Sequence, residues 1–295
     1  MAINLNALRV FTTVVERGGF SRAAEALRIS QPAVSKAVRE LERQVGIELL
    51  DRRQRIARPT DAGAMLAERG RELFATERLA EEELRAARGL SRGTLRIAAS
   101  TTIATYLLPP LLAAYHRRWP GISLVVASAN TRRVARLLTY RRVDVALVEG
   151  PIADPRIDVV AWREDELIIV APASHRLARR RSVSPEALAE ESFIVREPGS
   201  GTRAVAHAAL RDAGVRARTA LVLGSTEAIK QGVIAGLGLA IVSREACVDQ
   251  LAAGRLAEVR VTGLKIRRPF TRLVLRGVRA PGAVAAFEEI LANDS

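Results

Sequence analysis

The first part of the chain carries apolar residues at helical spacing. They recur three and four positions apart from Leu8 to Val15, which predicts a first helix. Gly18-Gly19 should end that helix, because glycine adopts positive φ angles at little cost. We expect Ser21 to cap a second, short helix over residues 22–27.

A third helix is expected after a turn at Ile29-Ser30. Pro32 suits its first turn, where the missing proline N–H breaks no hydrogen bond. One side of this helix is apolar and should be buried. Its apolar residues, spaced three or four positions apart, are Val34, Val38, Leu41 and Val45. Two short helices joined by a tight turn indicate a helix-turn-helix.

The opposite side of the third helix is polar and basic, with Glu42 as the one acidic residue that we place there. Its side chains are donors of the kinds that bond base edges and phosphates in a major groove. This pattern favours a DNA-reading helix over an ordinary solvated face. The candidate DNA contacts are Ser21, Arg22, Gln31, Pro32, Ala33, Ser35, Lys36, Arg39 and Arg43.

An arginine-rich extension, DRRQRIAR, follows at residues 51–58. Its arginines suit phosphate or minor-groove contacts, and a two-stranded wing would present them to DNA. We therefore add Arg52, Arg53 and Arg55 to the candidate DNA contacts. Residues 1–60 are predicted to form a winged helix-turn-helix domain.

A long amphipathic helix is expected next, capped by Thr60 or Asp61 and running to about Arg88. Four apolar residues in it repeat every seven positions, the spacing of a helix that pairs with its own copy. The pattern alone fits a solitary amphipathic helix equally well. The repeating residues are Leu66, Leu73, Ala80 and Ala87. Residues 61–92 are thus interpreted as a linker helix and hinge.

The remaining two thirds of the chain alternates apolar strand-like segments with helical ones. This order is typical of an α/β domain with mostly parallel sheets covered by helices on both faces. The expected strands are 94–99, 122–127, 143–148, 167–171, 193–195, 220–223, 239–242 and 272–275. The expected helices are 107–119, 131–140, 185–190, 203–213, 227–235, 244–253 and 282–292.

Three loops in this part place hydroxyls and backbone N–H groups between a strand and the start of a helix. A helix N-terminus carries partial positive charge and unpaired donors, so it attracts anions. Taken singly, each loop is explained by an ordinary N-cap. If the loops converge, they form a site for a small carboxylate, phosphate or sulfur oxyanion. The candidate contacts, including a turn residue near the expected cleft, are Ser100, Thr101, Thr102, Glu149, Gly199, Ser200, Gly201, Thr202, Ser225 and Thr226.

The formal net charge of +14 over 295 residues favours a polyanionic partner. Charge does not locate the binding surface, because residues 1–58 carry 11 basic and 6 acidic side chains and residues 93–295 carry 29 and 19. Arginine supplies 43 of the 46 basic residues, a skew that codon bias would also produce.

Residue types that carry other chemistry are scarce. Cys247 is the only cysteine, so an intramolecular disulfide and a cysteine-based zinc site are excluded, and a buried thiol is favoured over a redox role. The three histidines form no metal or catalytic-triad pattern. We expect no cofactor, no metal and no enzymatic activity. The first residues, MAINLNALRVF, show no basic segment followed by a long apolar one, and no window has the apolar length needed to span a bilayer. We therefore expect a cytoplasmic protein without a membrane partner.

The chain resembles the LysR-type transcriptional regulators over its whole length. The family's N-terminal pattern is matched in order and spacing, although Leu50 stands where the family usually has Phe. The matching residues are Phe11, Ser21, Ala23-Ala24, Leu27, Ser30-Gln31-Pro32-Ala33, Ser35, Leu41-Glu42, Gly46, Leu49-Leu50, Arg52, Arg55, Thr60 and Ala62-Gly63. The GSGT segment at 199–202 resembles members that sense small anions in sulfur or carbon-fixation metabolism.

The resemblance implies an α+α/β protein: a winged helix-turn-helix, a long linker helix and a two-lobed effector domain of periplasmic-binding-protein type. Lobe 1 would cover about 93–164 and 263–295, and lobe 2 about 165–262, joined by two crossing strands. It implies a sequence-specific regulator that binds double-stranded DNA and responds to a small, anionic effector held between the lobes.

Further partners follow from the same resemblance. The linker helix would form a dimer, and the family pattern implies a dimer of dimers; RNA polymerase is a further candidate partner. The alternative interpretation is a cytoplasmic small-anion-binding α/β protein, or an enzyme, with an incidental helix-turn-helix.

Overall fold

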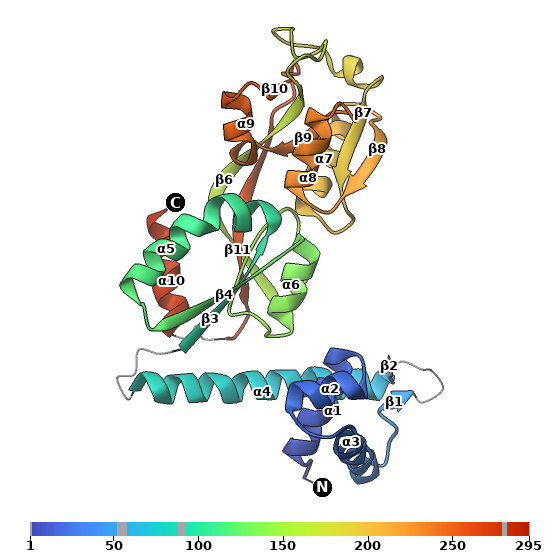
Figure 1. Cartoon of the computed structure of the whole chain (residues 1–295), viewed down its shortest axis with the longest axis vertical. Helices are drawn as coiled ribbons and strands as arrows, with labels where there is room; N and C mark the ends of the chain where they lie inside the picture. Colours follow the sequence, from blue (N-terminus) through green and yellow to red (C-terminus); the bar gives the residue numbers. More distant parts are fainter. Residues whose placement is uncertain (1, 52–57, 88–92, 279–281, 295) are drawn as a thin grey trace. The chain divides into compact units, whose positions relative to one another are not determined.

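The computed structural model describes residues 2–51, 58–87, 93–278 and 282–294. The chain divides into two compact units, Met1–Arg88 and Gly89–Ser295, and each is described by itself (Figure 1). The winged helix-turn-helix, the long helix and the α/β domain predicted from the sequence are all present.

The first unit packs three helices against the start of a fourth. The helices are α1 (Leu5–Arg17), α2 (Phe20–Leu27), α3 (Gln31–Val45) and α4 (Asp61–Ala87), and strands β1 (Leu50–Asp51) and β2 (Arg58–Pro59) pair antiparallel as the base of the wing. Its core contains the fully buried Phe11, Val34 and Leu41. The predicted apolar side of α3 therefore faces inward.

The second helix starts earlier than expected, so the predicted Ser21 cap is wrong. Helix α2 begins at Phe20, its N-cap is Gly19, and no side chain caps it. The glycine pair explains the difference: Gly18 ends α1 with φ at 68°, and Gly19 is extended, so the chain re-enters helix at once. Ser21 lies exposed in the first turn.

Glu42 is buried, which corrects its predicted place on the exposed side of α3. Its carboxylate accepts hydrogen bonds from the backbone N–H groups of Leu49 at 2.9 Å and Leu50 at 3.2 Å. The exposed acidic residue on this helix is Glu40, which forms an ion pair with Arg43. Glu42 thereby fixes the end of α3 to the base of the wing.

The long helix α4 belongs partly to the first unit. Thr60 accepts a hydrogen bond from the Gly63 N–H at 3.0 Å, as expected for a cap, and Phe74 is buried under the guanidinium of Arg9 at 4.0 Å. The seven-residue repeat does not form one exposed face, because Leu66 packs against the core of this unit while Leu73 is exposed. The side chain of Ala87 lies outside the described residues.

The second unit is built on a seven-stranded mixed sheet. Parallel strands β4 (Ile122–Ala129), β3 (Gly93–Ser100) and β5 (Val145–Glu149) lie side by side, and the antiparallel pair β11 (Ile266–Leu275) and β6 (Ile157–Pro172) follows β5. Strands β9 (Ala240–Ser243) and β10 (Leu256–Glu258) pair with β6. A separate parallel pair consists of β7 (Ser192–Arg196) and β8 (Arg218–Leu223).

Helices cover these sheets. They are the π-helical turn η1 (Ile103–Leu107), α5 (Leu108–Arg118), α6 (Thr131–Thr139), the 3₁₀ turn η2 (Pro185–Leu188), α7 (Gly201–Asp212), α8 (Thr226–Ile234), the 3₁₀ turn η3 (Arg244–Cys247), α9 (Val248–Ala252) and α10 (Gly282–Asn293). One apolar core surrounds Tyr115, Phe270 and Phe287, and another surrounds Phe193 and Leu239. Strands β6 and β11 run from one core to the other, as the two crossing strands implied by the resemblance (Figure 1).

The crossing strands are longer than their predicted apolar parts. Expected strands at 167–171 and 272–275 extend to 157–172 and 266–275, and β10 was not expected. The added residues alternate between buried and exposed or include charges, so they lack the continuous apolar character that we used to find strands. Cys247 is fully buried, and burial raises the pKa of its thiol to about 11.

Replacing Glu42 with alanine should loosen the junction between α3 and the wing. The change leaves two buried backbone N–H groups without an acceptor, which costs about 2–4 kcal/mol in unfolding free energy. We expect faster native-state hydrogen exchange at the amides of Leu49 and Leu50. Glu40→Ala removes an exposed carboxylate of the same helix and should leave those amides unchanged; equal effects of the two changes would contradict this role for Glu42.

Candidate functional site

Helix α3 presents a polar, largely basic surface. Gln31, Lys36 and Arg39 are exposed on it, and Arg39 donates a hydrogen bond to the hydroxyl of Ser35 at 3.0 Å. Arg43 is exposed but carries the ion pair with Glu40. Lys36 and Arg39, near the middle of α3, are therefore the cations of this surface without an ion pair among the described contacts.

The start of α3 is open to solvent. Ser30 caps it by accepting a hydrogen bond from the Ala33 N–H at 3.3 Å, and Pro32 and Ala33 are exposed. A capped helix N-terminus with exposed small residues allows close approach of a phosphate or a base edge. Ser21 and Arg22 of α2 are exposed as well, and Arg22 donates to the Gly18 carbonyl at 2.8 Å. Arg52, Arg53 and Arg55 lie outside the described residues.

In the second unit, Arg196 joins two of the three predicted loops. Its Nη1 donates to the hydroxyl of Thr101 at 2.7 Å and to the hydroxyl of Thr226 at 3.2 Å. Thr101 follows β3, Thr226 begins α8, and Arg196 ends β7. The loops at 100–102 and 225–226 therefore converge on one buried guanidinium, whose residue is only 4% exposed.

The charge of Arg196 is balanced by its neighbour. Its Nε and Nη2 donate to the two carboxylate oxygens of Glu197 at 2.8 and 3.0 Å. Burial raises the pKa of Glu197, but the hydrogen bonds and charge of Arg196 outweigh it and hold that pKa below its ordinary value. Arg203 also turns toward this loop and donates to the Arg196 carbonyl at 3.0 Å.

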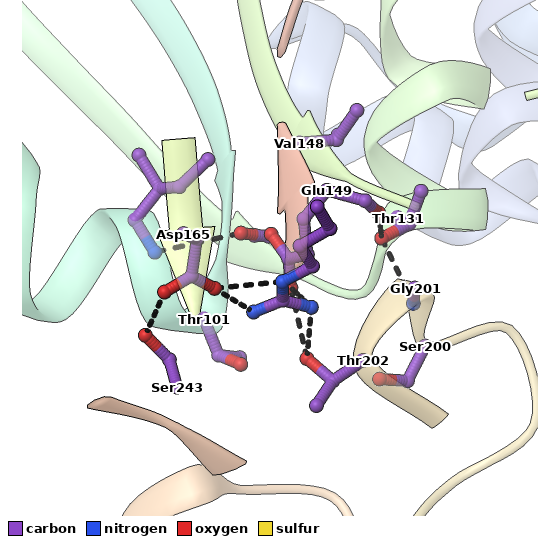
Figure 2. A network of polar contacts seen from close by, with 12 residues as sticks. Thr101, Thr131, Val148, Glu149, Asp165, Ser200, Gly201, Thr202 and Ser243 are labelled. Carbon is purple, nitrogen blue, oxygen red and sulfur yellow. Dashed lines mark hydrogen bonds and ion pairs between the residues drawn. The ribbon is translucent and has the colours of Figure 1, made fainter. Parts of the chain in front are cut away.

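The third predicted loop, GSGT, docks on the ends of β5 and α6. The hydroxyl of Thr131 donates to the Glu149 carbonyl at 2.9 Å and accepts from the Gly201 N–H at 3.1 Å (Figure 2). The Arg132 N–H donates to the Gly199 carbonyl at 3.1 Å. These bonds link the first turn of α7 to the carboxyl end of the parallel sheet, the edge at which α/β folds bind ligands.

A buried ion-pair cluster lies beside this loop, where the crossing strands pair. Arg268 of β11 and Asp165 of β6 are register partners. The guanidinium Nε donates to the Asp165 carboxylate, labelled in Figure 2, at 2.7 Å, and its Nη2 lies 2.7 Å from the same carboxylate. Nη1 donates to the hydroxyl of Thr202 at 2.9 Å. Ser243 donates to the second oxygen of Asp165 at 2.7 Å. Burial raises the pKa of Asp165, although Arg268 and Ser243 draw it back down.

Glu149 completes the cluster at the end of β5. Its Oε1 accepts from the hydroxyl of Thr202 at 3.2 Å and lies 3.8 Å from Nη1 of Arg268. Its Oε2 is buried and accepts no hydrogen bond from the residues that the structure describes. A single buried guanidinium thus stands between two buried carboxylates.

Three predicted serines act as helix caps, whereas the side chain of Thr102 forms no cap hydrogen bond. Ser100 accepts from the Ile103 N–H at 3.4 Å, Ser200 caps α7, and Ser225 caps α8. Ser100 and Thr102 are buried, whereas Ser225 is exposed. These contacts are those of ordinary N-caps.

Four residues of this network escaped the sequence analysis: Thr131, Asp165, Ser243 and Arg268. The position of Arg268 could have been inferred from its strand. Arg268 lies two residues from both Ile266 and Phe270, and side chains two positions apart in a strand point to the same side, which is the buried one here. The burial of Asp165 could not be inferred in this way, because Asp165 and Glu166 stand together just before the apolar segment 167–171.

Two grooves lie elsewhere in the second unit. One, of about 550 Å³, is lined along residues 166–169 and 258–261 together with 263–266. The other, of about 540 Å³, is lined by α7 residues and by residues 263–267. Neither includes the Arg196 or Glu149 contacts. Among the described helices, none is long and apolar enough to cross a lipid bilayer.

A helix-turn-helix unit followed by a two-core α/β unit defines a DNA-binding regulator with a ligand-binding domain. Residues 5–64 match the family described as bacterial regulatory helix-turn-helix protein, lysR family, and residues 88–294 match the LysR substrate binding domain. The chain belongs to the LysR family of transcriptional regulators.

Individual relatives agree with this assignment. The RuBisCO operon transcriptional regulator of Allochromatium vinosum is 35% identical over the whole chain and 97% of the relative. The regulatory domain of Synechocystis PCC6803 CcmR, solved with 2-PG, is 28% identical with a TM-score of 0.65, covering 69% of this chain and 97% of that domain. A full-length OxyR variant from Pseudomonas aeruginosa shares the fold, with 23% identity and a TM-score of 0.74 over 99% of this chain and 94% of that one.

Placing a methyl group on Gly201 should disrupt the docking of the GSGT loop. A Cβ at this position would lie 1.7 Å from the Glu149 carbonyl oxygen and 2.7 Å from the Thr131 hydroxyl. We expect Gly201→Ala to destabilise the second unit by about 1–3 kcal/mol or more, as overpacking does. Tryptophan fluorescence reports the melt, because Trp119 and Trp162 both lie in this unit.

Gly224→Ala is the matched control for this substitution. A Cβ there would meet nothing within 4 Å, so the variant should melt like the parent protein. An unchanged melt of Gly201→Ala would show that the loop does not depend on this close approach.

Proposed function

We propose that this LysR-type regulator reads an operator through α3 and the wing, and that a small anion bound between the two lobes of its second unit modulates that binding. The observation that carries the effector part is the convergence of Thr101 and Thr226 on Arg196. Two helix N-termini thus meet at one buried guanidinium, an arrangement that favours an anion. The proposed contacts are those predicted from the sequence, with Arg196 added.

The division of the chain follows from this role. We assign residues 1–60 to DNA binding, 61–92 to the linker and hinge, and 93–295 to the effector domain. Lobe 1 would comprise about 93–164 and 263–295, and lobe 2 about 165–262; the two cores on either side of the crossing strands support that split. The role is regulatory and not catalytic, in the cytoplasm.

The assembly we propose is a dimer, extended to a dimer of dimers, formed through α4. Leu73 and Leu84 support it, because both are large apolar side chains exposed on that helix. A dimer would present two copies of α3 to the two halves of one operator. RNA polymerase is the proposed partner in activation.

The relatives indicate which anions to test first. The Allochromatium vinosum protein is named for the RuBisCO operon, and the Synechocystis regulatory domain was solved with 2-PG. We therefore propose that 2-PG and inorganic anions are the first probes for this chain.

Arg196→Met should abolish anion binding. The change removes the buried positive charge and both contacts to the threonine hydroxyls, so calorimetric titration of the full-length protein with 2-PG or phosphate should lose its signal. Arg211→Met is the control, because Arg211 is exposed and pairs only with Asp212 among the described contacts. Arg196→Lys keeps the charge and guards against misfolding. Undiminished binding by both Arg196 variants would refute this site.

Arg39→Ala should weaken specific operator binding by about 1–3 kcal/mol if Arg39 reads a base. Fluorescence anisotropy with the operator, identified by genome-wide mapping of bound DNA, and with a scrambled duplex separates the two kinds of contact. Arg43→Ala should cost less, because Arg43 is already paired with Glu40. An Arg39→Ala protein with unchanged operator affinity would remove Arg39 from the interface.

A further inference from the structure

Two polar atoms of the buried cluster at the crossing strands lack hydrogen bonds among the described residues. They are Oε2 of Glu149 and Nη2 of Arg268. Glu149 is 1% exposed and Arg268 is 3% exposed. Buried polar groups are nearly always satisfied, so a carboxylate oxygen without a donor, beside a guanidinium nitrogen held only by an ion pair, favours a ligand group at this cluster.

The side chains around these two atoms already form hydrogen bonds with one another. The Thr202 hydroxyl accepts from Arg268 Nη1 and donates its single proton to Oε1 of Glu149. The carboxylate of Asp165 accepts hydrogen bonds from Nε of Arg268 and from the hydroxyl of Ser243. Nη2 of Arg268 forms an ion pair with the Asp165 carboxylate at 2.7 Å, but without the geometry of a hydrogen bond to any residue that the structure describes. No described side chain of the cluster is left to donate to Oε2 of Glu149.

The charges of Glu149, Asp165 and Arg268 limit which ligand groups this cluster can bind. Two carboxylates and one guanidinium leave the cluster with one excess negative charge when all three are ionised. A bare oxyanion placed against Oε2 of Glu149 would be repelled. An O–H group fits both open atoms, since its oxygen accepts from a guanidinium while its proton goes to a carboxylate.

We propose that the effector of this protein carries an O–H donor next to its anionic charge, and that Glu149 selects for that donor. The inference rests on the proposed effector site and adds a specificity to it. The anionic part would face Arg196 and the helix N-termini, and the O–H would face Glu149 and Arg268. Hydroxy acids and singly protonated phosphoryl groups belong to this class; fully deprotonated sulfate does not.

Inorganic phosphate and sulfate test this proposal with the full-length protein. The two ions are similar in size and shape, but near neutral pH phosphate keeps at least one O–H and sulfate has none. We expect calorimetry to show phosphate binding about tenfold or more tighter than sulfate, the worth of one charge-assisted hydrogen bond. Glycolate and methoxyacetate repeat the comparison for carboxylates, because methylation removes the O–H.

Glu149→Gln identifies the residue responsible. Glutamine keeps the shape but offers an N–H₂ donor in place of one acceptor oxygen, so the preference for phosphate should vanish or reverse in favour of sulfate. Glu186→Gln is the control, because Glu186 of η2 is exposed and contacts none of the cluster residues among the described contacts, so the preference should remain intact. The parent protein's own ratio tests the proposal even if Glu149→Gln fails to fold.

The outcomes separate this inference from the proposed function. Equal affinities for phosphate and sulfate, or tighter sulfate binding, would overturn the role of Glu149 while leaving the anion site standing. A phosphate preference that survives Glu149→Gln would overturn it as well. Absence of binding by all four anions and 2-PG would instead refute the anion site itself, and this inference with it.

Discussion

The second unit depends on one cross-strand ion pair. Arg268 and Asp165 face each other in the register of β11 and β6, the two strands that run from one apolar core to the other. A guanidinium that is 3% exposed stays buried only while carboxylate and hydroxyl partners surround it. Those partners come from β5, β6 and α7, so the same charge links the sheet to the GSGT loop. The proposed effector contacts sit on this frame.

The two units place their polar side chains differently. In the first, α3 buries Val34, Val38 and Leu41 and leaves its basic side in solvent, so a rigid helix presents flexible donors. In the second, the polar groups are turned inward and bonded to one another. An anion bound at the proposed effector site would replace some of the internal hydrogen bonds of Arg196 with bonds to the ligand. A ligand that binds one arrangement of the lobes better than another would shift the protein toward that arrangement.

Much of the fold was predictable because it is local. Apolar spacing located most helices, although η1 was not expected, and buried strands such as β5 are marked by almost continuous apolar residues. The sequence pattern was wrong at two positions. Glu42 lies on the buried side of α3 and not on its exposed side, and Gly19 occupies the N-cap position of α2 that we expected for Ser21. The site was predictable only in part. Loops rich in serine and glycine can be recognised in the sequence. Asp165 and Arg268 cannot be paired in this way, because they lie 103 positions apart and meet only through strand pairing.

We propose that a small anion is held by the loops around Arg196 and Glu149. Hydrogen–deuterium exchange of the full-length protein, with and without phosphate or 2-PG, tests this site most directly. We expect slower exchange, together and in the same titration, at residues 100–103, 148–150, 199–203 and 225–228. Protection confined to residues 166–169 and 258–266, which line the larger groove, would contradict it and move the effector to another face of the domain.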